Sequence, residues 1–191
     1  KTNMDQFATG LVGTRSPYGV PGNSFNPDYI PGGSSSGSAV AVAKGLISFS
    51  LGTDTAGSGR VPASFNNILG YKPTRGIISN RGIIPACRSL DCVSVFGLQV
   101  SDILEVLLVL EEWDPQDPFS RKKKILTSKS FPERPKVALL EDEQLDFFGD
   151  SIARKAYDKS ISILAQSGLN LDTGDLSPFL KAAELLYAGP W

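Results

Sequence analysis

The sequence contains no histidine among its 191 residues. Hydrolases of the Ser-His-Asp and Cys-His types use an imidazole as general base, so these residues cannot assemble either kind of site. Zinc is not expected either, because two cysteines without any histidine cannot complete a tetrahedral ligand set. A serine nucleophile in this chain therefore needs a different base.

The sequence also lacks an excess of positive charge and long apolar runs. Its 19 Lys and Arg residues balance 20 Asp and Glu residues, so neither a nucleic acid nor an anionic membrane is expected as a partner. No apolar run reaches the roughly 18 residues of a membrane span, and no signal-peptide pattern is present. With Cys87 and Cys92 interpreted as reduced thiols, these features indicate a cytoplasmic globular protein.

Two loops of small residues flank a predicted helix and strand. Residues 1–33 are rich in Gly, Pro, Asn and Ser and are expected to be mostly loop. Serines ahead of the alanine-rich run 39–44, with Gly45 after it, predict a helix. The apolar stretch 46–51 predicts a buried strand, and the small residues 52–59 predict the next loop. If the helix packs antiparallel to the strand, the two loops lie close together.

The remaining pattern predicts an α/β protein with a mixed sheet. Residues 77–78 are expected to form a short strand, and 102–112 a buried helix. The proline-containing, basic stretch 113–135 is expected to be a linker or a surface excursion. A βαβ-like unit is then predicted from a strand at 137–140, a helix at 150–166, a strand at 169–171 and a helix at 177–187. Both ends look truncated, so we expect the other strands of the sheet to lie outside this chain.

The loop that ends at Ser58 is the strongest candidate for chemistry. A phosphate-binding P-loop would end in Gly-Lys-Ser/Thr, which neither small-residue loop does, and the dinucleotide pattern G-x-G-x-x-G is not met. Acyl transfer fits better, because the small side chains of Thr55, Ala56 and Gly57 leave backbone N–H groups able to bind an oxyanion. Asp54, with a pKa of about 4, is a poor base, and we expect it to fix the loop by hydrogen bonds. A desolvated lysine suits the role of base better.

Several stretches together resemble the amidase signature family. They are 32–39, 51–63, 72–76 and 88–91, with 1–3 at the start. The resemblance implies a mixed β-sheet core covered by helices and a Ser–cis-Ser–Lys relay. In that relay Ser58 is the nucleophile and Ser34 is the bridging serine, which follows a cis peptide bond. The family's oxyanion hole matches the backbone N–H groups of Thr55, Ala56, Gly57 and Ser58.

The charged residues inside the chain are expected to have structural roles. In the family the relay lysine matches a position upstream of Lys1, and Lys1 itself matches a different position, so the base is expected outside residues 1–191. Lys44 is interpreted as a helix end and Lys72 as part of a turn. Arg88 lies in a Cys-Arg-Ser-Leu-Asp-Cys turn, where we expect an ion pair with Asp91.

Within the family, the stretches 5–19, 85–92 and 185–191 resemble the allophanate hydrolases. Residues 1–191 are therefore interpreted as one partial amidase domain of this type. The resemblance implies serine-dependent hydrolysis of allophanate, the carboxylated form of urea, to ammonia and carbon dioxide. Tyr187 matches a substrate-contacting tyrosine, whose partner arginine would follow Trp191. The alternative for Tyr187 is an aromatic side chain packed near a helix end.

The resemblance implies no cofactor and no metal in this domain. It implies a small-molecule substrate, a homodimer, and a protein that either stands alone or is fused to, or works with, a biotin-dependent urea carboxylase. Two other functions stay open: another amidase of the family, such as the subunit that supplies ammonia in transfer-RNA amidation, or an inactive structural module. A cation placed for a small carboxylate would favour allophanate, whereas an open tunnel would favour the transfer-RNA amidation subunit.

Overall fold

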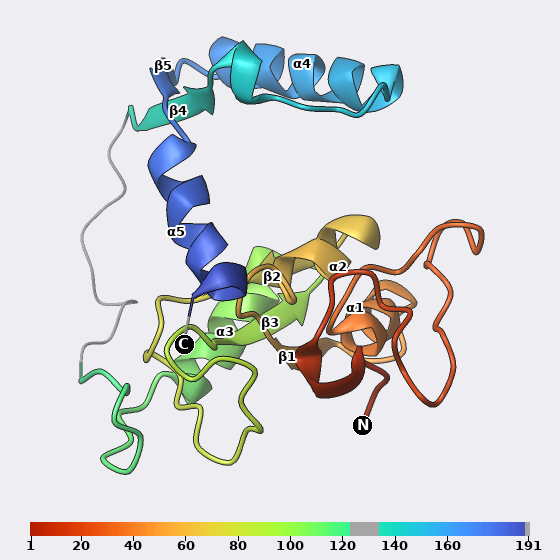
Figure 1. Ribbon diagram of the computed structural model, residues 1–191, viewed down its shortest axis with the longest axis vertical. Coiled ribbons are helices and arrows are strands. Elements are labelled where there is room, and N and C mark those ends of the chain that lie inside the picture. The colour runs from red at the N-terminus through yellow and green to blue at the C-terminus, as the bar shows by residue number, and fades with distance from the viewer. Residues whose placement is uncertain (123–133, 190–191) are drawn as a thin grey trace. The chain divides into compact units, whose positions relative to one another are not determined.

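The computed structural model describes residues 1–122 and 134–189, which fall into two compact units (Figure 1). The first unit spans Lys1–Thr127 and the second spans Ser128–Trp191. Each contains both helices and strands, as the predicted α/β class requires. Among the described residues, no helix is both long enough and apolar enough to cross a membrane.

The first unit is built on a three-stranded antiparallel sheet in the order β1-β3-β2. The strands are β1 (Phe49–Thr53), β2 (Leu69–Tyr71) and β3 (Val93–Gly97). Strand β3 pairs with both neighbours, and all of its residues are buried. Its Val and Phe side chains suit a central strand that is covered on both faces. Gly97 is the register partner of Phe49 on one side and of Leu69 on the other.

Several expectations about strands are wrong. Strand β1 begins at Phe49, and both Leu46 and Phe49 are exposed, so 46–51 is not a buried strand. Residues 77–78 form no strand, although both side chains are buried. The sequence pattern predicts neither β2 nor β3, yet β3 supplies the partner of β1 from within the chain. A short apolar run looks alike in a strand and in a buried turn, and pairing with a distant segment decides between them.

Three helices pack on this sheet: α1 (Ser36–Ala43), α2 (Arg60–Phe65) and α3 (Val100–Leu110). Helix α1 confirms the helix predicted after the serines, but it begins three residues before the alanine-rich run. Helix α2 is not predicted by the pattern; Pro62 stands in its first turn, where proline is tolerated. Ala39, Val42 and Ala63 pack with Phe96 of β3, and this cluster supports both small-residue loops.

Helix α3 covers the sheet with one face only. Ile103 and Leu107 pack against Val95 in the second core cluster, whereas Leu108 and Val109 are exposed. The predicted buried helix at 102–112 is therefore buried only along one stripe, as is usual for an amphipathic helix whose other face meets solvent.

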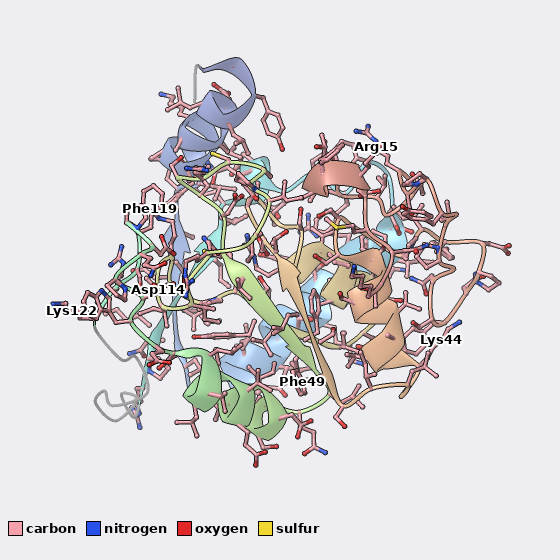
Figure 2. All side chains as sticks on the ribbon, turned by 90° about the horizontal axis from the view of Figure 1, so that it is seen from below. Arg15, Lys44, Phe49, Asp114, Phe119 and Lys122 are labelled. Carbon is pink, nitrogen blue, oxygen red and sulfur yellow. The ribbon has the colours of Figure 1, made fainter. Side chains whose placement is uncertain are left out.

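The stretch after α3 packs against residues 75–81 as far as the structure describes it. The Asp114 carboxylate accepts hydrogen bonds from Ser79 Oγ and from Arg81 Nε, at 2.9 and 2.7 Å. The Arg75 guanidinium lies 4.2 Å from the ring centre of Phe119. Figure 2 shows Asp114 and Phe119 on the same side of this unit. The rest of the predicted linker, 123–133, lies outside the described residues.

The second unit confirms the predicted βαβ arrangement. Strands β4 (Lys136–Leu140) and β5 (Asn170–Gly174) pair in parallel, and α4 (Ser151–Gln166) connects them. The short 3-10 helix η2 (Asp142–Gln144) precedes α4, and α5 (Ser177–Ala188) follows β5. Asp150 caps α4, because its Oδ1 accepts hydrogen bonds from the N–H groups of Ile152 and Ala153, both at 2.9 Å.

Candidate active site

The two loops rich in glycine and serine lie side by side in the first unit, as predicted. The backbone N–H of Ser35 donates to the carbonyl of Ser58 at 3.2 Å, and Ser35 Oγ donates to the carbonyl of Thr53 at 3.2 Å. Gly52 permits this approach, because a Cβ at that position would lie 2.4 Å from Ser35 Oγ. The backbones of the loops before α1 and after β1 are therefore joined directly.

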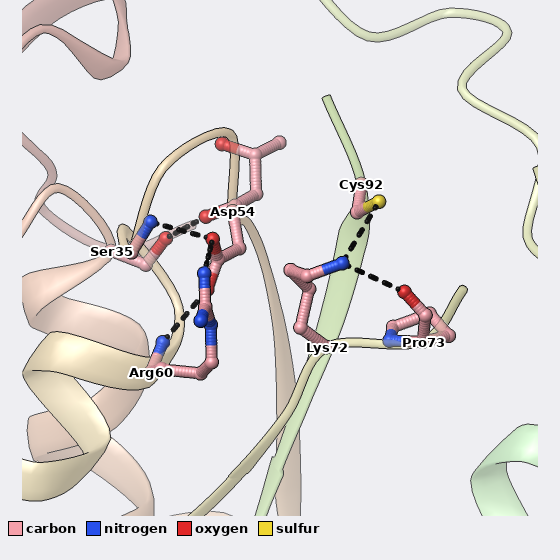
Figure 3. Close-up of polar contacts among 8 residues, drawn as sticks. Ser35, Asp54, Arg60, Lys72, Pro73 and Cys92 are labelled. Atoms are coloured by element: carbon pink, nitrogen blue, oxygen red, sulfur yellow. Dashed lines mark hydrogen bonds and ion pairs between the residues drawn. The ribbon is translucent and has the colours of Figure 1, made fainter. Parts of the chain in front are cut away.

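Asp54 fixes the second loop from inside (Figure 3). Its carboxylate is fully buried and accepts hydrogen bonds from the N–H groups of Gly57 and Arg60, at 2.7 and 3.0 Å. The Arg60 side chain adds two more, from Nε at 2.9 Å and Nη2 at 3.0 Å. Burial alone would raise the pKa of Asp54, but these hydrogen bonds outweigh it and leave the pKa below its ordinary value. Asp54 thus has the structural role predicted for it and is no general base.

The hydrogen bond from Gly57 to Asp54 removes one donor from the predicted oxyanion hole. The N–H of Gly57 is already donated to Asp54 Oδ1, so Gly57 does not offer a free donor, contrary to expectation. Gly57 instead adopts a φ of +125°, a conformation that favours glycine. The N–H groups of Thr55, Ala56 and Ser58 donate to no acceptor within 1–122 or 134–189. These three remain able to bind an oxyanion.

Ser58 ends this loop and is only 4% exposed. Its carbonyl accepts the hydrogen bond from Ser35, which fixes the backbone at this point. Its hydroxyl forms no hydrogen bond with any residue that the structure describes. A serine on a fixed backbone, next to uncommitted N–H groups, is what a nucleophile in acyl transfer requires.

Ser34 follows a cis peptide bond with Gly33 and is completely buried. Its Oγ has no hydrogen-bonding partner among the described residues. A buried hydroxyl without a partner is uncommon in folded proteins and calls for an explanation, such as a role in catalysis. The relay implied by the family resemblance would join the hydroxyls of Ser34 and Ser58, but no hydrogen bond connects them in this structure, although the two serines lie on adjoining loops.

A second buried carboxylate, which sequence reasoning missed, holds the loop of Ser34. Asp5 is fully buried, and its N–H donates to the carbonyl of Ser34 at 2.9 Å. Its carboxylate accepts hydrogen bonds from the N–H groups of Gly13 and Arg15, at 2.9 and 2.8 Å. The segment from Asp5 to Arg15 therefore anchors the cis-peptide loop. The one signal in the sequence was an acidic residue at the start of a glycine-rich loop.

Residues 1–191 match the model of the family described as Amidase. The chain belongs to the amidase family. It is 44% identical over 192 residues to the urea amidolyase of Saccharomyces cerevisiae, an alignment that covers 100% of this chain and 10% of that protein. It is 40% identical over 171 residues to a subunit of the glutamyl-tRNA(Gln) amidotransferase of Lactobacillus delbrueckii subsp. bulgaricus, covering 88% of this chain and 36% of that protein.

Solved structures of the amidase family confirm the predicted fold. The allophanate hydrolase of Kluyveromyces lactis matches with a TM-score of 0.93 at 46% identity, over 98% of this chain and 31% of that one. The urea amidolyase of the same yeast matches with a TM-score of 0.94 at 47% identity, over 100% of this chain and 12% of that one. The chain thus spans between a tenth and about a third of these relatives.

Of the two lysines interpreted from the sequence, Lys44 lies at a helix end, as predicted, and Lys72 directly follows strand β2. Lys44 follows the last residue of α1, and the Lys72 ammonium donates to the carbonyl of Pro73 at 3.0 Å and lies 3.7 Å from Cys92 Sγ (Figure 3). Burial raises the pKa of the Cys92 thiol, and the Lys72 charge offsets part of that rise. No lysine that the structure describes donates to the candidate serines.

Arg88 does not form the predicted ion pair with Asp91. The Asp91 carboxylate accepts hydrogen bonds from the hydroxyl of Thr55 and from the N–H groups of Ala86 and Cys87. Its acceptor capacity is therefore used by uncharged donors. Arg88 instead lines a cavity of about 240 Å³.

Tyr187 lies in the second unit, in the last turn of α5, and is 79% exposed. The alternative of a tightly packed aromatic does not describe this side chain within its own unit. Its contact with a substrate stays a prediction. In the described part of the chain, no group of three or more His, Cys, Asp or Glu residues could hold a metal ion.

Proposed function

We propose that this chain carries the nucleophile-bearing part of a serine-dependent amide hydrolase whose substrate is allophanate. The observation that carries the proposal is the loop from Asp54 to Ser58. A buried carboxylate fixes it, and the N–H groups of Thr55, Ala56 and Ser58 have no acceptor among the described residues. Such preorganised donors stabilise an oxyanion without reorganising during the reaction.

In the proposed reaction, Ser58 Oγ attacks the carbonyl carbon of the amide. Its proton passes to Ser34 Oγ, whose own proton passes to a lysine outside residues 1–191. The N–H groups of Thr55, Ala56 and Ser58 stabilise the tetrahedral oxyanion. The amine leaves with a proton returned along the relay, and water then cleaves the acyl-serine ester.

The choice of allophanate rests on the relatives. Urea amidolyases and an allophanate hydrolase match 98–100% of the chain at 44–47% identity, whereas the amidotransferase relative matches 88% of it at 40%. A biotin-dependent urea carboxylase, as a fused or working partner, is part of the same proposal; the chain covers only 10–12% of the urea amidolyase relatives, which leaves room for further domains. The homodimer and the contact of Tyr187 with the substrate carboxylate belong to this proposal as well.

The test compares serine variants in the intact protein that contains these residues, with ammonia release from allophanate as the assay. We expect Ser58→Ala to abolish hydrolysis and Ser34→Ala to lower kcat at least a hundredfold, the scale of positioned acid–base groups. Ser64→Ala, an exposed serine six positions after Ser58, is the control and should keep full activity. A folded Ser58→Ala protein with a tenth of the normal activity would show that Ser58 is not the nucleophile.

Activity toward glutamine as an ammonia donor, with none toward allophanate, would favour the amidotransferase function instead. The relatives named as amidotransferase subunits support that second candidate. Absence of both activities in a folded intact protein would favour a structural module.

A further inference from the structure

The candidate nucleophile loop is tied to a distant turn by one side-chain hydrogen bond. The hydroxyl of Thr55 donates to the Asp91 carboxylate, with 2.5 Å between Oγ1 and Oδ1, across 36 positions of sequence. Asp91 is only 3% exposed, so water competes little for this carboxylate. The contact connects the residue next to Asp54 with the Cys-Arg-Ser-Leu-Asp-Cys turn.

Asp91 is itself held in a fixed position. Its carboxylate accepts the N–H of Ala86 at 3.1 Å and the N–H of Cys87 at 3.0 Å. Its own N–H donates to the carbonyl of Cys87 at 2.9 Å, and its carbonyl accepts from Asn80 Nδ2 at 2.7 Å. No ion pair to Asp91 is present in the described residues. Its charge is therefore stabilised by neutral donors, which form strong hydrogen bonds to an ionised acceptor.

The two carboxylates restrain different parts of the loop. Asp54 restrains Gly57 and Arg60 through their N–H groups. Thr55 and Ala56 together make a single hydrogen bond within the described residues, and it is donated by the Thr55 hydroxyl. The contact with Asp91 is therefore the hydrogen bond that can restrain these two residues.

We propose that Asp91 is a positioning residue for amide hydrolysis, acting through the Thr55 side chain to aim the N–H groups of Thr55 and Ala56 at the oxyanion. The inference rests on the proposed function, which assigns these donors to the transition state. Donors that act on the transition state change kcat, whereas substrate binding in the ground state changes KM. Removing a whole oxyanion donor lowers kcat about a hundredfold to a thousandfold. A donor that is misdirected but still present loses less, and we expect roughly tenfold to a hundredfold.

The experiment removes the hydroxyl at constant shape in the intact protein. Thr55→Val deletes the donor and keeps a β-branched side chain, whereas Thr55→Ser keeps the hydroxyl. Thr53→Val is the matched control, because the Thr53 hydroxyl is buried two residues upstream without a hydrogen-bonding partner among the described residues. Thr55→Ala also lacks the hydroxyl and is smaller than threonine. A loss of kcat shared by both variants therefore cannot come from poor packing of the valine side chain. The assay gives kcat and KM for allophanate together with the melting temperature.

The expected result is a kcat lowered at least tenfold in Thr55→Val and Thr55→Ala, with KM within about twofold of normal. Thr55→Ser should retain at least about a third of kcat, and Thr53→Val should be unchanged. A normal kcat in folded Thr55→Val, or an equal loss in Thr55→Ser, would overturn the inference. Ser58→Ala is measured beside them: if it is inactive while Thr55→Val is normal, only the role of Asp91 fails. Full activity of Ser58→Ala would refute the proposed function itself.

Discussion

Replacing Arg60 by methionine tests whether its guanidinium stabilises the candidate loop. Methionine is unbranched and flexible, so it removes the charge while keeping much of the side-chain length. Asp54 would keep the two backbone N–H groups and lose the hydrogen bonds from Nε and Nη2. The carboxylate would stay fully buried with half of its partners gone.

The exposure of Arg60 sets the size of the effect. Removing one partner of a fully buried ion pair costs about 3–5 kcal/mol, because the other charge stays buried alone. The Arg60 side chain is 54% exposed, so water can replace part of the lost interaction. We therefore expect the free energy of unfolding to fall by about 2 kcal/mol. In a domain of about 150–250 residues that corresponds to roughly 4–8 °C in melting temperature.

The loss should depend on pH. In the folded protein, burial raises the pKa of Asp54, but the hydrogen bonds from Arg60 and Gly57 lower it by more. The net pKa is therefore below the ordinary value. A depressed folded-state pKa adds stability that is complete above the unfolded value of about 3.9 and is lost as the pH falls through the folded value. Without Arg60 the effect of burial is opposed less and the pKa of Asp54 rises. The stability difference between the two proteins should therefore be largest near neutral pH and shrink below about pH 4.

The assay is urea unfolding at about pH 7, 5 and 3.5. Arg88→Met is the control, because Arg88 is exposed and has no acidic partner among the described residues; it should change stability by less than about 0.5 kcal/mol. A loss in Arg60→Met that is equally small, or that does not change with pH, would refute the view that this ion pair stabilises the loop.

Two further substitutions test the contact between the loops and the recognition of the substrate. Gly52→Ala should lower the free energy of unfolding by about 2 kcal/mol and reduce kcat, because its Cβ would lie 2.4 Å from Ser35 Oγ; Gly22→Ala, whose Cβ would meet nothing closer than 3.9 Å, should do neither. Tyr187→Phe should raise KM for allophanate about fivefold, the equivalent of roughly 1 kcal/mol, and leave kcat unchanged. Equal losses on allophanate and on a neutral amide would contradict a carboxylate contact by Tyr187.

Local signals predicted those parts of the fold that depend on neighbouring residues. The alternation of strand and helix after residue 135 can be read within short windows, and the βαβ unit follows it closely. The sheet of the first unit depends on pairing between distant segments. Strand β3 pairs with β1 and β2, and no local pattern in 69–71 or 93–97 states which segment will be the partner. Tertiary context therefore decided these strands.

In the candidate site too, local features could be predicted from the sequence, whereas contacts between distant residues could not. Small residues mark the loops around Ser34 and Ser58, because only small side chains let the two backbones approach. The ion pair expected for Arg88 followed from nearness in sequence, but Asp91 instead accepts the hydroxyl of a residue 36 positions away. A buried carboxylate binds the donors that the fold places next to it. The hydrogen-bond partners of such a carboxylate therefore cannot be predicted from nearby residues in the sequence.

Three buried aspartates explain how loops of such small residues hold a fixed shape. Asp5, Asp54 and Asp91 each accept backbone N–H groups from a separate segment of the site. Glycine lets the loops of Ser34 and Ser58 meet but costs conformational entropy, since it restricts the chain least. A carboxylate that binds several N–H groups opposes that freedom and satisfies backbone donors that regular structure does not. The rigidity that an oxyanion hole requires thus comes from side chains behind the loops rather than from the loops themselves.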